Sequence, residues 1–134
     1  MPVAMSGQAP DAAAIERMGR AALARIPEPF ASHLGDVVLI VEEFADEETL
    51  DALRIEDPLE LSGIYSGPSL AEQSSFDSGR LPSRIHLYRM PILYEWAADG
   101  EDLETLVWHI VIHEVGHHFG LSDADMHALE DSAG

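Results

Sequence analysis

The sequence contains no cysteine and no lysine among its 134 residues. Without cysteine, the chain has no disulfide, no thiolate nucleophile and no cysteine ligand, so a bound metal must be held by His and carboxylate side chains. Without lysine, Schiff-base chemistry and the lysine of a phosphate-binding P-loop are excluded. The chemistry left open to this chain is that of His, carboxylate and hydroxyl groups.

Positive charge and long apolar runs are scarce as well. Seven basic residues, all Arg, stand against 25 acidic ones, giving a formal net charge of −18. Because such a chain is repelled by phosphate backbones and anionic membranes, we expect no nucleic-acid partner and no membrane partner. The longest apolar run, residues 37–41, is far shorter than the roughly 18 residues of a membrane span. The first ten residues lack the basic start and apolar stretch of a secretory signal, so we expect a cytoplasmic protein.

The composition is that of an ordinary globular protein, with 46% hydrophobic and 24% charged residues. At this length the chain forms one domain, which we place at residues 11–134 after a flexible tail at 1–10. The absence of Lys and Asn, with abundant Ala, Gly and Arg, suggests a bacterial source.

Hydrophobic periodicity predicts an α+β domain with a small sheet. The expected helices cover residues 11–26, 46–54, 99–119 and 123–131, and the expected strands cover 37–44, 59–65 and 84–90. A loop rich in Ser, Gly and Pro at 66–83 is expected to border a binding cleft. The strand at 84–90 is the candidate to hold a peptide as an added β-strand.

The chemically informative segment is HEVGHHFGLSD at residues 113–123. His113 and His117 are four residues apart on a predicted helix, so their imidazoles project from one face and can chelate one ion. Glu114 lies about 100° further round the helix and can reach a water on that ion without being a ligand. Gly120 permits a sharp reversal of the chain, which can bring Asp123 back as a third ligand.

Two imidazoles, one carboxylate and an open fourth position are typical of a catalytic zinc site, and we expect one Zn²⁺ per chain. In this scheme Glu114 can reach the metal-bound water and act on it as a general base. Asp123 is the preferred third ligand, with Glu130, Asp125 and His127 as alternatives.

The segment HEVGHHFGLSD resembles the HExxHxxGxxD signature of the zincin metallopeptidases, in particular the bacterial zincin-like type 1 family of minimal zincins. The segments LSGIYSGPSL and LPSRIHLYRMPI are similar to that family's Leu-Gly-Leu-Tyr-x-Gly and Pro-x-x-Ile-x-Leu-Tyr-Arg patterns. The resemblance extends from about residue 12. It implies a minimal zincin-like fold, in which a small mixed sheet packs on an active-site helix flanked by N- and C-terminal helices. It also implies zinc ligation by His113, His117 and Asp123, catalysis by Glu114, and a peptide or protein substrate.

Two other readings remain open at this point. One is a metal-binding regulatory module of the same fold without turnover, and the other is a structural zinc domain closed by a fourth ligand such as His127. Apart from the expected ligands and Glu114, we expect His109 to be a partly buried structural residue and His118 to point away from the ligands. Tyr65, Tyr88 and Tyr94 are expected to be packing aromatics with their hydroxyls at the surface.

Overall fold

The computed structural model of the protein describes residues 9–28, 30–31, 37–66 and 83–120, together with 122, 124–125, 127–128 and 131. Within these ranges the chain forms, in order, α1 (Ala12–Ala24), β1 (Val38–Glu42), α2 (Glu47–Ala52), the 3-10 turn η3 (Pro58–Glu60), β2 (Gly63–Ser66), β3 (Arg84–Tyr88), α4 (Arg89–Asp99) and α5 (Leu103–Phe119). The expected tail, the loop at 66–83 and the last helix at 123–131 lie wholly or largely outside the described residues. None of the described helices is long and apolar enough to cross a membrane.

The three strands form one mixed sheet in the order β1-β3-β2. β1 runs parallel to β3, with Ile40 opposite His86, and β2 runs antiparallel to β3, with Ile64 opposite the same residue. The α+β class and the small mixed sheet are therefore confirmed. The expectation that residues 84–90 accept a peptide as an added strand is wrong, because β3 is central and both its edges are already paired.

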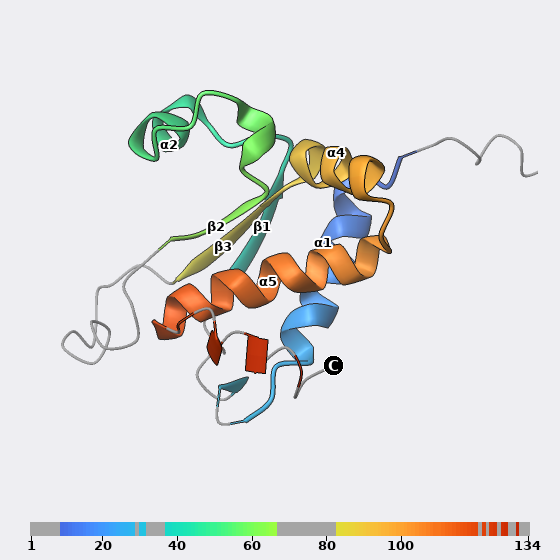
Figure 1. The fold of residues 1–134 in the computed structure, drawn as a ribbon, viewed down its shortest axis with the longest axis vertical. Helices are drawn as coiled ribbons and strands as arrows, with labels where there is room; N and C mark the ends of the chain where they lie inside the picture. The colour runs from blue at the N-terminus through green and yellow to red at the C-terminus, as the bar shows by residue number, and fades with distance from the viewer. Residues whose placement is uncertain are drawn as a thin grey trace, which may run out of the picture.

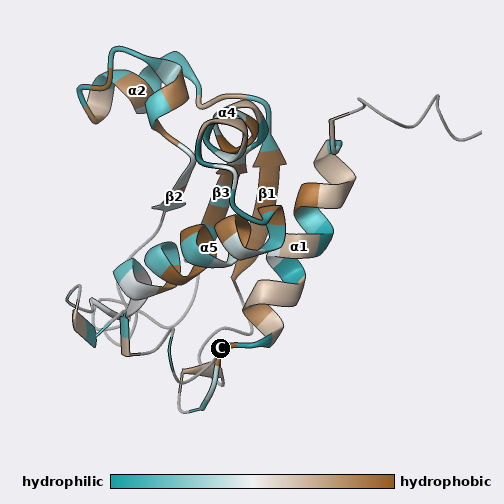
Figure 2. Ribbon diagram, turned by 45° about the vertical axis from the view of Figure 1, so that its right-hand side comes forward, coloured by the Kyte–Doolittle hydropathy of each residue, from teal (hydrophilic) through white to brown (hydrophobic). Residues whose placement is uncertain are grey.

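Helices α1 and α5 cover one face of this sheet, as Figure 1 shows. Alternate residues of β1 and β3 point toward the helices, because successive side chains of a strand face opposite sides. The main core lies between these layers and includes Ile15, Leu39, Ile85, Leu87, Val107, Val111, Ile112 and Val115. Figure 2 shows hydrophobic colouring on β1 and β3, paler colouring on β2, and helices of mixed polarity beside them.

A smaller cluster lies at one end of the sheet and ties α2 to it. Its buried members are Ala45, Leu50 and Tyr88, with Ile55, Leu61 and Ile64 packed around them. Tyr88 is only 2% exposed, so the expectation of a surface hydroxyl is wrong for this residue. The burial of Tyr88 follows from its place at the end of the central strand, beneath the α2 segment.

The segment after β3 differs from the expectation. The strand expected at 84–90 ends at Tyr88, and residues 89–99 form helix α4, which was not predicted from the sequence. Asp99, expected to begin the next helix, instead ends α4, and Gly100 adopts a left-handed φ of 73° behind it. The alternation of apolar and polar residues in β3 continues into the first turn of α4. The sequence pattern therefore does not indicate where the strand ends and the helix begins.

Helix α5 has clear signals at both ends. Asp102 caps its N-terminus by accepting a hydrogen bond from the Thr105 N–H at 3.2 Å, which satisfies one of the free amide groups of the first turn. Gly120 closes the C-terminus with a φ of 70°, a conformation that favours glycine. The expected end of the helix at residue 119 is thus confirmed, and it places the HExxH segment in the last two turns.

Candidate metal centre

His113 and His117 lie together on the exposed face of α5. Their rings are stacked one helical turn apart, with centroids 6.1 Å apart and an interplanar angle of 26°. Both residues are exposed, and the His117 side chain retains 56% of its accessible surface. The shared face expected from the spacing of four is therefore present in the fold.

Glu114 is a buried acidic residue beside the two histidines. Only 7% of its surface is exposed, although it neighbours two exposed histidines. Its Oε1 lies 3.2 Å from Nδ1 of His117. A proton on Nδ1 lets His117 donate to this carboxylate and leaves the Nε2 lone pair of the ring available to a metal. The contact therefore orients the carboxylate and the imidazole together.

The third ligand expected from the sequence, Asp123, lies outside the described residues, as does its alternative Glu130. Among the residues that the structure describes, no group of three or more His, Asp or Glu side chains is arranged to hold a metal ion. The other two alternatives, Asp125 and His127, are described and exposed, and neither forms such a group with the histidine pair.

The donor chemistry of the described pair fits zinc. Zinc in proteins takes imidazole nitrogen and carboxylate oxygen ligands, and a catalytic site needs three of them with one position open. His113 and His117 would supply two nitrogens on a solvent-facing surface, where a third ligand and a water or substrate would have access to the same ion.

Strand β2 packs closely against α5 beside this site. A Cβ built on Gly63 would come within 2.8 Å of Cγ2 of Ile110 on α5 and 3.1 Å of the carbonyl oxygen of His86 on β3. A side chain at Gly63 would therefore require the Ile110 side chain or the strand to shift, and it would also crowd the backbone of β3. The glycine thus permits the close packing of β2 on the helix that carries His113 and Glu114.

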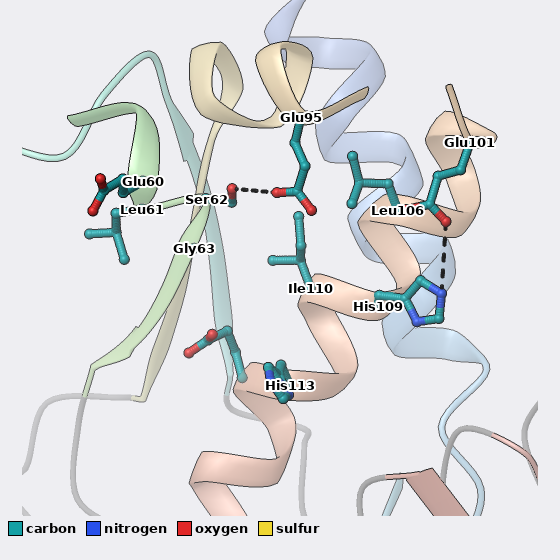
Figure 3. A pocket seen from close by; sticks show the side chains of 11 residues that line it. Glu60, Leu61, Ser62, Gly63, Glu95, Glu101, Leu106, His109, Ile110 and His113 are labelled. Carbon is teal, nitrogen blue, oxygen red and sulfur yellow. Dashed lines mark hydrogen bonds and ion pairs between the residues drawn. The ribbon is translucent and has the colours of Figure 1, made fainter. Parts of the chain in front are cut away.

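A recess of about 400 Å³ adjoins the histidine pair, between β2, α4 and α5. His113 and Glu114 lie at one end of it, and Ser62 and Gly63 of the β2 side form part of its wall. Figure 3 shows Glu95 reaching into the recess from α4, where the Ser62 hydroxyl donates a hydrogen bond to its Oε1 at 3.1 Å. These wall residues were missed in the sequence, because no local pattern links residues so far apart along the chain.

Burial shapes the electrostatics behind the site. It raises the pKa of Tyr88 to about 12, and the carboxylates of Glu42, Asp46 and Glu114 add to the shift because they disfavour a phenolate nearby. Tyr88 is therefore a neutral hydroxyl at any physiological pH.

The remaining sequence candidates differ from expectation in part. His109 is exposed rather than partly buried, with Nε2 4.0 Å from Oε2 of Glu101. Tyr94 is 59% exposed and is not a packing aromatic. Tyr65 packs against the main core and donates a hydrogen bond from its hydroxyl to Oγ of Ser83 at 3.0 Å. The side chain of His118 lies outside what the structure describes.

Comparison with known proteins supports this picture. The sequence model of a family described as zincin-like metallopeptidase matches residues 34–133, well over half of the chain and including the whole HExxH segment. A search of the curated proteins finds no match.

Proposed function

The chain belongs to the zincin-like metallopeptidase family, and on that premise we propose that it hydrolyses peptide bonds at one zinc ion. In this proposal His113, His117 and Asp123 hold the ion and Glu114 is the catalytic base. The observation that carries it is the pairing of two exposed histidines on one helical face with a buried carboxylate, at the end of a recess large enough for a side chain.

Zinc bound at this face would supply Lewis-acid chemistry, polarising the scissile carbonyl and making a water molecule more acidic. Glu114 takes the proton from the attacking water and transfers it to the leaving amine. Its burial and its contact with His117 restrict its rotamers, so the carboxylate is held in one place before substrate arrives.

Strand β2 is the element we propose for substrate binding. Among the described strands it lies at an edge of the sheet and pairs only with β3, so its other side can bond an extended peptide. Because Gly63 allows β2 to lie close to Ile110, a peptide added along this edge would pass over the face of α5 that carries His113. In this proposal β2 replaces residues 84–90 as the strand that binds the peptide.

Metal content and cleavage of a mixed peptide library, measured on the same preparations, test the proposal. We expect one zinc per wild-type chain, reduced affinity in Asp123→Ala, and cleavage products only when zinc is present. Glu114→Gln should retain zinc and lower the turnover rate by about 10²–10⁴-fold, since it removes a general base.

Glu104→Gln is the matched control, because it makes the same change at an exposed position in the first turn of the same helix and should leave turnover unchanged. Wild-type turnover by Glu114→Gln would refute the assigned role of the carboxylate. Zinc binding without cleavage of any peptide would instead support the regulatory module.

A further inference from the structure

We propose that the recess beside His113 and Glu114 binds a basic side chain of the peptide substrate, and that Glu95 is the carboxylate that pairs with its cation. The inference rests on the proposed peptidase function and names the substrate class for that site. It makes Glu95 and Ser62 specificity-determining residues.

The recess has a single sign of charge. Its lining includes carboxylates from four separate segments, Glu60 of η3, Glu95 of α4, Glu101 of the connection to α5, and Glu114, and no Arg side chain. A second recess, of about 560 Å³, lies beside α2 and is also rich in carboxylates, but Arg54 lines it together with Glu47, Asp51 and Glu56. The recess next to the histidines differs from it because no cationic Arg side chain in its lining competes for the carboxylates.

The carboxylate of Glu95 is positioned to bind a cation of the substrate rather than to be surrounded by water alone. It is half-buried, and the Ser62 hydroxyl donates to its Oε1 at 3.1 Å across the recess. A carboxylate has two oxygens with several acceptor sites, so one bond from a hydroxyl leaves capacity for a guanidinium or ammonium group. Because the side chain is already held, a cation that binds it has less rotamer entropy to freeze out.

The wall of the recess is apolar where a long side chain would lie. Leu61, Leu106 and Ile110 contribute to the lining, and Figure 3 shows Ile110 directly below the carboxylate of Glu95. Arg and Lys side chains bury aliphatic stems against such surfaces while their charged heads stay near polar groups. An apolar wall with a carboxylate at its end matches this shape, whereas a small or acidic side chain matches neither part.

The outer edge of β2, which pairs with no other strand in the part of the chain that the structure describes, is a further indication that the ligand is a peptide. Gly63, the first residue of β2, and Ser62 directly before it both belong to the wall of the recess. A peptide added along β2 directs alternate side chains to the same side of the sheet, so one of them faces α5 near His113. The recess is the space that receives this side chain.

A titration followed by NMR tests the binding step without requiring catalysis. The full chain, supplied with one equivalent of zinc, is titrated with N-acetyl-arginine amide and with N-acetyl-citrulline amide, a neutral side chain of the same shape. We expect saturable shifts of the Ser62, Gly63 and Ile110 amide signals with arginine, and binding weaker by about tenfold with citrulline, since one charge-assisted hydrogen-bond pair is lost. Glu95→Gln should remove this difference, whereas Glu48→Gln, an exposed α2 residue outside the recess, should preserve it.

Cleavage of paired peptides tests the specificity step. Peptides carrying arginine or citrulline at each position next to the scissile bond should differ in kcat/KM by about tenfold at one position, and Glu95→Gln should equalise them. Equal binding and equal cleavage of the two series would overturn the inference while leaving the peptidase proposal intact. Arginine-selective shifts without cleavage of any peptide would instead refute the peptidase function, and shifts confined to other surfaces would refute the recess as the binding site.

Discussion

Helix α5 carries two stripes of side chains with the same spacing and opposite environments. Val107, Val111 and Val115 recur every four residues and are completely buried, whereas His109, His113 and His117 recur at the same interval and are exposed. The stripes are offset by two residues, which is about 200° around a helix. One stripe therefore packs the core and the other faces the solvent, and the difference between valine and histidine decides which stripe does which.

Glu114 lies at the border between these two faces. It follows His113 in the chain and precedes Val115, and its exposure of 7% is closer to that of the valines. A carboxylate in that position is costly to bury unless it is hydrogen-bonded, and the contact with His117 offsets part of this cost. The candidate catalytic and metal-binding residues therefore lie where the buried and exposed faces of α5 meet.

The largest expected effect separates histidines within the exposed stripe. His117→Ala should abolish stoichiometric zinc binding and turnover, lowering zinc affinity by more than about 100-fold, because a direct ligand contributes more than an outer hydrogen-bond partner does. His109→Ala, one stripe position further from the motif, should retain one zinc per chain. Zinc content after dialysis against a weak chelator measures both variants, and equal retention would contradict the assignment of His117 as a ligand.

A smaller effect is expected from a substitution on the face of α5 that packs into the core. Ile112 is 1% exposed in the main core, so Ile112→Ala should lower the free energy of unfolding by about 2–4 kcal/mol through lost burial and the cavity left behind. His109→Ala, on the exposed side, should change it by less than about 0.5 kcal/mol. Urea denaturation followed by circular dichroism gives both values. Similar losses in the two variants would mean that the two faces do not differ in packing as described.

The smallest expected effect concerns Tyr88, where burial and the carboxylates act together. Because the pKa of Tyr88 is raised to about 12 in the fold from 10.0, the fold favours the neutral phenol. The resulting stability is fully present below pH 10 and is lost as the pH rises toward 12, by up to about 2 kcal/mol. Unfolding free energies between pH 9.5 and 11.5 should fall less steeply for Tyr88→Phe than for the wild type. Parallel curves would show that Tyr88 ionises as an ordinary surface tyrosine.

The parts of the fold that local pattern predicts are those with strong periodicity or strong end signals. The apolar repeat of α5, its closure by Gly120 and the cap of α1 by Asp11, which accepts from the Ala14 N–H at 2.9 Å, all follow from the sequence. Helix α4 does not, because its start continues the alternation of β3 and Pro91 lies in its first turn, where proline is tolerated but gives no helical repeat.

The order of the strands in the sheet also could not be predicted from local sequence pattern. β1 and β3 pair although more than 40 residues separate them, with Val38 opposite Arg84, and this pairing makes β3 central. Which of the described strands lies at an edge of the sheet depends on contacts of this kind, so local pattern could not show that residues 84–90 lack an unpaired edge for an added peptide strand.

The sequence by itself determined the donor set and its spacing. A helix with 3.6 residues per turn brings His113 and His117 to one face whatever surrounds it, and the lack of cysteine and lysine limits the side chains available as metal ligands to imidazole, carboxylate and hydroxyl groups. Only the tertiary structure decided that Glu114 is buried, that Gly63 lies where β2 packs on α5, and that Ser62 and Glu95 meet across one recess. The physical reason is that burial and contacts between distant segments arise from packing the whole chain, whereas the direction of a side chain on a helix is set by the helix alone.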